Sequence, residues 1–280
     1  MTTMPPIISS ADLVDHPDAV LADVRWYLDG RSGREAYEAG HLPGAVFVDL
    51  ERDLSTRAQR PTAGRHPFPE PESFAAAMSR LGIGDASTVI AYDDTGGITA
   101  GRLVVMLRMI GCDAALLAGG ITAWQGALMT GAGAIPEVLD FTPRPWPADR
   151  FADAVETAGL AAVPGAVVMD ARSAERFTGE LTEIDPRPGH IPGAASAPAT
   201  ATIDPATALV RPPAELRDHF GRLGVDATTP TVTYCGSGVS ACMNVLAMEH
   251  AGLPPARLYV ASFSGWAADP AHPVELGTGR

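Results

Sequence analysis

The sequence has few cysteines and no long apolar run, and each shortage excludes a class of protein. Three cysteines in 280 residues, at Cys112, Cys235 and Cys242, cannot form a disulfide framework and fit a reducing compartment. Nowhere do about 18 apolar residues follow one another, and the first residues form neither a basic leader nor an apolar segment. We therefore expect a cytoplasmic protein without a membrane partner.

Positive charge is also scarce. The 20 Lys and Arg residues face 33 Asp and Glu residues, which gives a net charge of −13. Binding to a nucleic acid duplex requires clustered basic side chains, so we expect no nucleic acid partner. Salt screens interactions between exposed charges that lie more than about 8 Å apart. The binding of a small anion therefore depends on the few charges that line its site.

The chain contains two copies of one unit. An Asp-x-Arg segment and a later His-x-Pro-Gly-Ala segment occur at Asp23 and His41, and again at Asp170 and His190. Three further pairs share one separation of 142 residues: Arg80 with Arg222, Tyr92 with Tyr234, and Trp124 with Trp266. A constant separation across three pairs indicates a duplicated domain.

The segment between the copies and the pattern within them predict the organisation of the fold. Residues 131–150 are rich in glycine and proline, which oppose helix and sheet, so we predict a linker there between domains at 1–130 and 151–280. Within each copy, short apolar runs alternate with helical patterns. This alternation predicts an α/β fold of two tandem domains, each a small parallel sheet with helices on both faces.

Cys235 lies where such a fold places its chemistry. It joins a predicted strand at 231–234 to a predicted helix at 240–252, and open parallel sheets bind ligands at the carboxyl ends of their strands. Gly236 and Gly238 permit positive φ angles that turn amide groups inward, and the helix dipole, with Ser240 as a candidate cap, also favours a thiolate. The alternative is a buried structural cysteine in a glycine turn. The first copy has Asp93 at the matching position, so we expect it to be catalytically degenerate.

The tandem copies, the two HxPGA segments, the cysteine missing from the first copy and the stretch CGSGVSA together resemble the two-domain rhodanese-like sulfurtransferases. The resemblance implies an enzyme in which Cys235 takes a sulfane sulfur from 3-mercaptopyruvate or thiosulfate and holds it as a persulfide. The sulfur then passes to a thiol acceptor such as thioredoxin, or to cyanide. The CGSGV form is similar to the mercaptopyruvate branch, but the choice of donor stays open.

The resemblance also implies roles for individual residues. A loop that cradles the persulfide would comprise Gly236, Ser237, Gly238, Val239, Ser240 and Ala241. Arg176 matches the substrate-binding arginine of the family, and Arg187 is a candidate second contact to the anion. Ser237, His41 and Asp29 would manage the thiol proton, although His41 also fits a structural role. No cofactor or metal is implied, and we expect a monomer.

Two other functions compete with this interpretation. A cysteine-dependent phosphatase requires a Cys-x5-Arg loop. Residue 241, where that arginine would stand after Cys235, is alanine, so the sequence argues against a phosphatase. A non-catalytic sulfur carrier or binding module that retains the loop remains the alternative to an enzyme.

Overall fold

The computed structural model describes residues 4–279, which form two compact units. The first unit contains residues 4–56, 68–147 and 204–210, and the second contains residues 57–67, 148–203 and 211–279. Each unit therefore includes a short segment from the other half of the sequence. The family resemblance gave no reason to expect this exchange of segments.

The first unit is built on a five-stranded parallel sheet with strand order β1-β5-β4-β2-β3. Its strands are β1 (Ile7–Ile8), β2 (Val20–Asp23), β3 (Val46–Phe47), β4 (Val89–Tyr92) and β5 (Ala114–Leu117). Its helices are η1 (Ser10–Asp15), α1 (Gly33–Ala39), α2 (Leu50–Asp53), α3 (Pro71–Arg80), α4 (Ala100–Met109) and η3 (Gly120–Ala123).

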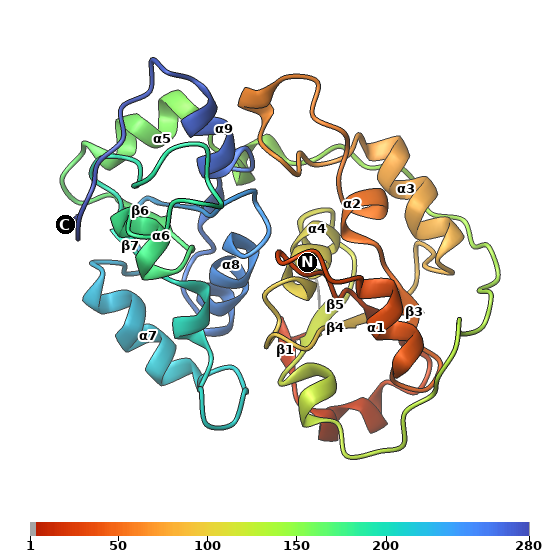
Figure 1. The fold of residues 1–280 in the computed structure, drawn as a ribbon. Coiled ribbons are helices and arrows are strands. Elements are labelled where there is room, and N and C mark those ends of the chain that lie inside the picture. The colour runs from red at the N-terminus through yellow and green to blue at the C-terminus, as the bar shows by residue number, and fades with distance from the viewer. Residues whose placement is uncertain (1–3, 280) are drawn as a thin grey trace. The chain divides into compact units, whose positions relative to one another are not determined.

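The second unit is built on a four-stranded parallel sheet with strand order β7-β6-β8-β9 (Figure 1). Its strands are β6 (Val167–Asp170), β7 (Ala195–Ser196), β8 (Thr231–Tyr234) and β9 (Arg257–Leu258). Its helices are η2 (Pro61–Ala63), η4 (Ala148–Arg150), α5 (Ala154–Ala161), α6 (Ala174–Thr178), η5 (Ala199–Thr202), α7 (Pro213–Arg222), α8 (Ala241–His250) and α9 (Ser262–Ala268).

The predicted α/β architecture is confirmed. The predicted strand at 231–234 is β8, all four residues of which are buried, and the predicted helix at 240–252 is α8. The first eight residues of α8 are buried, which explains why its sequence is apolar on every side.

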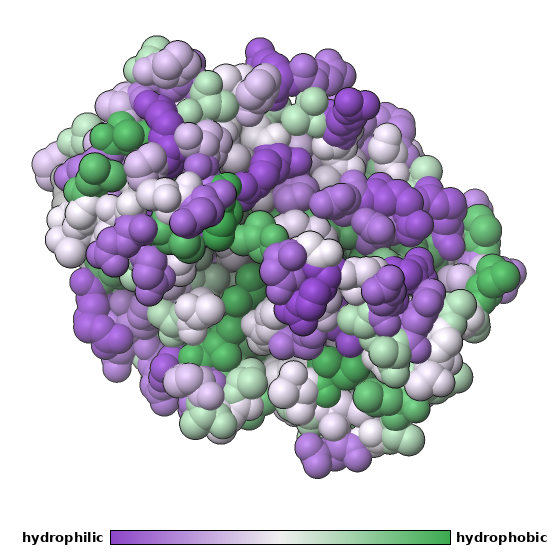
Figure 2. Space-filling model, viewed as in Figure 1, coloured by the Kyte–Doolittle hydropathy of each residue, from purple (hydrophilic) through white to green (hydrophobic). Residues whose placement is uncertain are grey.

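On the face drawn in Figure 2, hydrophilic residues predominate and hydrophobic ones are scattered among them. Residues 131–147 contain neither helix nor strand.

The Asp-x-Arg segments form the same buried ion pair in both units. Arg172 Nη2 lies 2.6 Å from Asp170 Oδ2 and donates to the carbonyl of Gly189 at 2.7 Å. Arg25 pairs in the same way with Asp23 at 2.7 Å and with the carbonyl of Gly40 at 2.7 Å. The expectation that both arginines bind carboxylates of their own domain is confirmed. Each arginine ties the end of a central strand to the start of an HxPGA segment.

The histidines of the HxPGA segments also have matching environments. His41 Nδ1 lies 2.9 Å from the carbonyl of Tyr37, and the two rings stack at 3.9 Å. His190 Nδ1 lies 2.8 Å from the carbonyl of Phe177, with stacking at 3.7 Å. Both side chains are buried. These contacts fix the turn before β3 and β7, which gives both histidines a structural role within their own unit.

No helix within residues 4–279 combines the length and the apolar character needed to span a bilayer.

Candidate active site

Cys235 directly follows β8 and is held by its backbone. Its N–H donates to Ser262 Oγ at 3.1 Å, and its carbonyl accepts from Phe263 N at 2.9 Å. Ser262 has a φ of +53°, which is uncommon for a residue other than glycine, and its hydroxyl donates to the carbonyl of Tyr259 at 2.8 Å. These contacts place the cysteine between β8 and the start of α9, with its side chain 1% exposed.

The loop after Cys235 surrounds its sulfur with donors. Val239 N lies 3.2 Å from Sγ. Burial opposes the thiolate, but hydrogen bonds from the Ser240 hydroxyl and from the amides of Ala241, Ser237 and Val239 outweigh it, so the pKa of Cys235 lies below its ordinary value. The thiolate is therefore favoured by neutral donors of the loop.

The two glycines of the loop serve different purposes. Gly238 has a φ of +73°, as expected for a turn that aims amides inward. Gly236 is absent from the residues with positive φ, so the expectation is wrong there. A Cβ at Gly236 would lie 2.6 Å from Arg176 Nη2 and 2.7 Å from Arg65 Nη2. Glycine at 236 leaves room for two guanidinium groups.

Ser240 does not cap α8 through its side chain. It is the residue before the helix, but its hydroxyl makes no capping hydrogen bond to the helix amides. The expectation of a cap is therefore wrong. The hydroxyl instead interacts with the Cys235 sulfur and helps to lower the pKa of that thiol.

The first unit contains the same kind of loop with an internal anion. The buried Asp93 carboxylate accepts from the amides of Thr95, Gly97 and Thr99 at 2.8 Å each and of Ala100 at 2.9 Å, and from the Thr99 hydroxyl at 2.8 Å. The loop after β4 is thus an anion cradle filled by its own side chain. It has no sulfur nucleophile.

A histidine from the segment 57–67 contacts the cysteine loop. His66 Nδ1 lies 2.8 Å from Ser237 Oγ, and both side chains are buried. Because the Ser237 amide also helps to lower the pKa of Cys235, this pair connects an imidazole to the edge of the sulfur site. Either partner can donate in this hydrogen bond, depending on the tautomer of the ring.

Cationic side chains line the same loop. Arg176 forms a two-point ion pair with Asp185, and the same carboxylate accepts from Arg172 Nη1 at 2.9 Å. Arg187, the other predicted anion contact, instead donates to the carbonyls of Ala267, Asp269 and His272 at 2.8 to 3.0 Å. Its guanidinium is therefore occupied by the backbone around α9.

Comparison with known proteins agrees with this geometry. The model of the rhodanese-like domain matches residues 10–127 and 148–269. The chain belongs to the rhodanese family. Its two matched segments correspond to the two copies identified in the sequence, and the fold expected from the resemblance is confirmed.

Proteins named as sulfurtransferases resemble nearly the whole chain. "Probable 3-mercaptopyruvate sulfurtransferase" from Pseudomonas aeruginosa is 38% identical over 94% of this chain and 94% of its own. "Putative thiosulfate sulfurtransferase SseB" from Mycobacterium tuberculosis is 38% identical over 96% of this chain and 95% of its own length. The crystal structure of SseA from Escherichia coli, a 3-mercaptopyruvate sulfotransferase, is 30% identical, covers 92% of this chain and 99% of its own, and has a TM-score of 0.79. The expectation of a sulfurtransferase is confirmed.

The predicted proton-handling residues of the first rhodanese domain have other contacts. His41 is held in its own unit as described above. Asp29 is exposed and pairs with Arg31 at 2.9 Å. Their catalytic roles stay predictions, and the contact with Ser237 favours His66 instead.

Sequence reasoning did not single out Arg65 and His66, which reach the cysteine loop from the segment 57–67. The sequence offered one signal for them: an arginine and a histidine stand side by side after Gly64, outside every repeated motif. Cys112 and Cys242 are buried, as expected of core residues.

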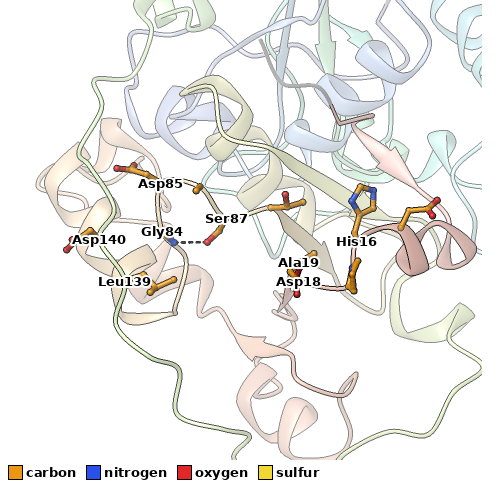
Figure 3. Close-up of a pocket in the computed structure, with 12 residues that line it drawn as sticks. His16, Asp18, Ala19, Gly84, Asp85, Ser87, Leu139 and Asp140 are labelled. Carbon is orange, nitrogen blue, oxygen red and sulfur yellow. Dashed lines mark hydrogen bonds between the residues drawn. The ribbon is translucent and has the colours of Figure 1, made fainter.

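A cavity of about 670 Å³ in the first unit has different chemistry (Figure 3). Carboxylates of Asp18, Asp85 and Asp140 surround it together with His16, and Gly84 N donates to Ser87 Oγ at its edge. It holds no cysteine, and its acidic lining opposes an anionic sulfur donor. Across residues 4–279, no group of three or more His, Cys, Asp or Glu side chains could hold a metal ion.

Proposed function

We propose that the chain transfers sulfur from 3-mercaptopyruvate through a persulfide on Cys235 to a thiol acceptor. The observation that carries the proposal is the hydrogen bond between His66 and Ser237 beside a cysteine whose thiolate is stabilised by its loop. Thiosulfate is the second candidate donor, and the SseB relative is the reason to keep it.

The two donors differ in whether a proton must move. When the Cys235 thiolate attacks the sulfur of 3-mercaptopyruvate, the C–S bond breaks, and the thiol proton of the donor ends on carbon as pyruvate forms. With thiosulfate the S–S bond breaks and sulfite leaves, with no proton transferred. In both cases the outer sulfur of the persulfide carries the negative charge.

A proton relay therefore suits mercaptopyruvate. His66 and Ser237 can take the thiol proton and return it to the departing carbon, because an imidazole exchanges protons near neutral pH. With thiosulfate as the donor no proton is transferred, so the His66–Ser237 pair would have no catalytic role. The Arg176 guanidinium, already aligned on Asp185, supplies positive charge for the donor carboxylate.

The second half of the reaction regenerates the enzyme. A thiol acceptor attacks the outer sulfur, becomes a persulfide itself and leaves Cys235 as a thiolate. Cyanide would take the same sulfur as thiocyanate. We propose a small protein or low-molecular-weight thiol as the acceptor, with thioredoxin as the first to test.

Parallel assays with the two donors test the proposal. Release of pyruvate from 3-mercaptopyruvate should exceed release of sulfite from thiosulfate in kcat/KM, and mass spectrometry should find one added sulfur on Cys235. Cys235→Ser should abolish both reactions. If neither donor is consumed and no sulfur is added to Cys235, the proposal fails, and the protein is a binding module of the rhodanese fold.

We further propose that the protein is a cytoplasmic monomer. All three cysteines are free thiols, which fits a reducing compartment. Cell fractionation tests the compartment. Sedimentation should give the mass of one 29.1 kDa chain, and a larger mass would contradict the monomer.

A further inference from the structure

The hydroxyl of Ser262 lies between the carboxyl ends of β8 and β9. It accepts from Cys235 N at 3.1 Å and donates to the carbonyl of Tyr259 at 2.8 Å, and the residue is fully buried. Tyr259 N donates to the carbonyl of Thr233 at 3.0 Å, which continues the parallel ladder of the two strands. The next bond of that ladder would run from Cys235 N to the Tyr259 carbonyl. Ser262 supplies this connection through its side chain instead.

The backbone of Ser262 adopts a conformation that is costly for a residue with a side chain. Its φ of +53° lies in the left-handed region, which glycine occupies readily and other residues rarely. Within residues 4–279, Ala208 is the only other residue besides glycines that has a positive φ. Strain of this kind persists where the surrounding structure enforces it, and it is concentrated at functional sites.

The first unit contains the same turn without the hydroxyl. Gly120, which lies 142 residues before Ser262, has a φ of +52°. The residue after Gly120 donates its amide to the carbonyl of Asp93 at 3.0 Å, and the residue after Ser262 donates likewise to the carbonyl of Cys235 at 2.9 Å. The turn therefore forms with glycine, and the strained serine occurs in the copy that carries the cysteine.

Both peptide groups of Cys235 are held by this turn. Ser262 accepts from its N–H, and Phe263 N donates to its carbonyl. The positions of the backbone N, Cα and carbonyl carbon determine the direction of the Cα–Cβ bond, and so the place of the sulfur. In this position Sγ lies 3.2 Å from Val239 N and interacts with the other donors of the loop. A displacement of about 1 Å in a reacting group can slow a reaction about 100-fold.

We infer that Ser262 is a positioning residue for sulfur transfer, whose hydroxyl directs the Cys235 side chain toward the donors of its loop. It acts through the cysteine backbone rather than by contact with a substrate. This inference rests on the proposed function, because it takes Cys235 as the nucleophile. Since both candidate sulfur donors meet the same sulfur, Ser262 supports their reactions equally, in contrast to His66.

Alkylation of Cys235 by iodoacetamide tests the inference without turnover. The thiolate displaces iodide and forms a C–S bond, so the rate depends on both the position and the charge of the sulfur. Ser262→Ala and Ser262→Gly should each slow this reaction about 10-fold or more at neutral pH. The pH at which the rate reaches half its maximum should rise in both, because the sulfur moves away from its donors. Mass spectrometry locates the added group on Cys235.

The two variants separate reactivity from stability. Both lose the hydroxyl, but glycine suits the left-handed φ and alanine does not, so Ser262→Gly should be the more stable of the two in urea. It also provides the test if Ser262→Ala does not fold. Reactivity should fall alike in both.

Thr157→Ala is a matched control in the same unit. The Thr157 hydroxyl is also buried, and it donates to the carbonyl of Asp153 at 2.6 Å, at the start of α5. Its loss should lower stability in urea and leave the alkylation rate and its pH midpoint unchanged.

Steady-state kinetics give a second measurement. In both Ser262 variants kcat should fall about 10- to 100-fold with 3-mercaptopyruvate and by the same factor with thiosulfate. KM should change by less than about threefold, because the binding of the sulfur donor is not affected.

The outcomes separate this inference from the proposed function. If Ser262→Gly reacts with iodoacetamide at the rate and pH midpoint of the wild type, or if reactivity follows stability so that only Ser262→Ala is impaired, Ser262 shapes the turn before α9 and the inference is wrong. A wild-type protein that turns over neither sulfur donor would refute the proposed function, while the alkylation rates would still report on Ser262.

Discussion

Arg176 and Asp185 form a two-point ion pair, with Nε 2.9 Å from Oδ2 and Nη2 2.7 Å from Oδ1. Burial opposes the Asp185 carboxylate, but Arg176 and Arg172 outweigh it and lower its pKa. Asp185→Asn should reduce the free energy of unfolding by about 3 kcal/mol, because the buried guanidinium of Arg172 and the part-buried guanidinium of Arg176 lose a charged partner. Urea unfolding measures the change.

A matched substitution at the surface serves as the control for Asp185. Asp29 forms a similar pair with Arg31, but both side chains are more than half exposed. Asp29→Asn should change stability little, since water screens the pair. If both variants unfold at the same urea concentration, the pair at Asp185 contributes no more than a surface ion pair.

His66 should matter for one donor only. His66→Ala leaves the Ser237 hydroxyl without its proton partner, so kcat with 3-mercaptopyruvate should fall about 100-fold or more. Turnover of thiosulfate should change by less than about threefold, because no proton moves in that reaction. Pyruvate and sulfite assays on one preparation measure both.

His41→Ala compares the two candidate histidines. Because His41 stacks on Tyr37 within the first unit, this variant should lose stability and affect both donors equally. A selective loss of mercaptopyruvate turnover in a stably folded His41→Ala protein would restore the role that the sequence suggested for it.

The reactivity of Cys235 should persist below the pH at which an ordinary thiol becomes unreactive. Only the thiolate is alkylated, and the hydrogen bonds of the loop lower the pKa of Cys235 against the effect of burial. The rate with iodoacetamide should therefore reach half its maximum below about pH 8.5, the value for a free cysteine. Ser240→Ala removes one donor to the sulfur, so its midpoint should move to higher pH. A midpoint that stays in place would mean that the Ser240 hydroxyl does not stabilise the thiolate.

The sequence predicted the parts of the site that follow one another along the chain. A β-branched run, a glycine turn and a helical pattern in succession placed Cys235 at the end of β8, and the repeat identified Asp93 as its counterpart. These features are local, and periodicity detects them. The predicted pairing of Arg25 and Arg172 with carboxylates also followed from short spacing.

The contacts that span the chain could not be predicted in this way. Ser237 and His66 are 171 residues apart, and the segment of His66 joins the unit formed mainly by the other half of the sequence. Arg187 lies close to His190 in sequence, yet backbone carbonyls around α9 hold its guanidinium. Only tertiary structure shows that these carbonyls hold the guanidinium of Arg187, and its role as an anion contact stays a prediction.

His219 should make the fold sensitive to acid. Burial, followed by the charges of Arg222 and Arg211, lowers the pKa of His219, and its buried Nε2 has no hydrogen-bond partner within residues 4–279. A histidine whose pKa is lower in the folded state binds fewer protons there than in the unfolded chain. Stability is therefore fully present above the ordinary histidine pKa and falls as the pH drops through it toward the folded value.

His219→Gln removes this titration and keeps a polar side chain of similar size. The urea midpoint of the wild type should fall more steeply between about pH 7 and pH 5 than that of the variant. Equal slopes for the wild type and His219→Gln would show that His219 is charged in the folded protein as readily as in the unfolded chain, since only a difference in proton binding between the two states can produce a slope.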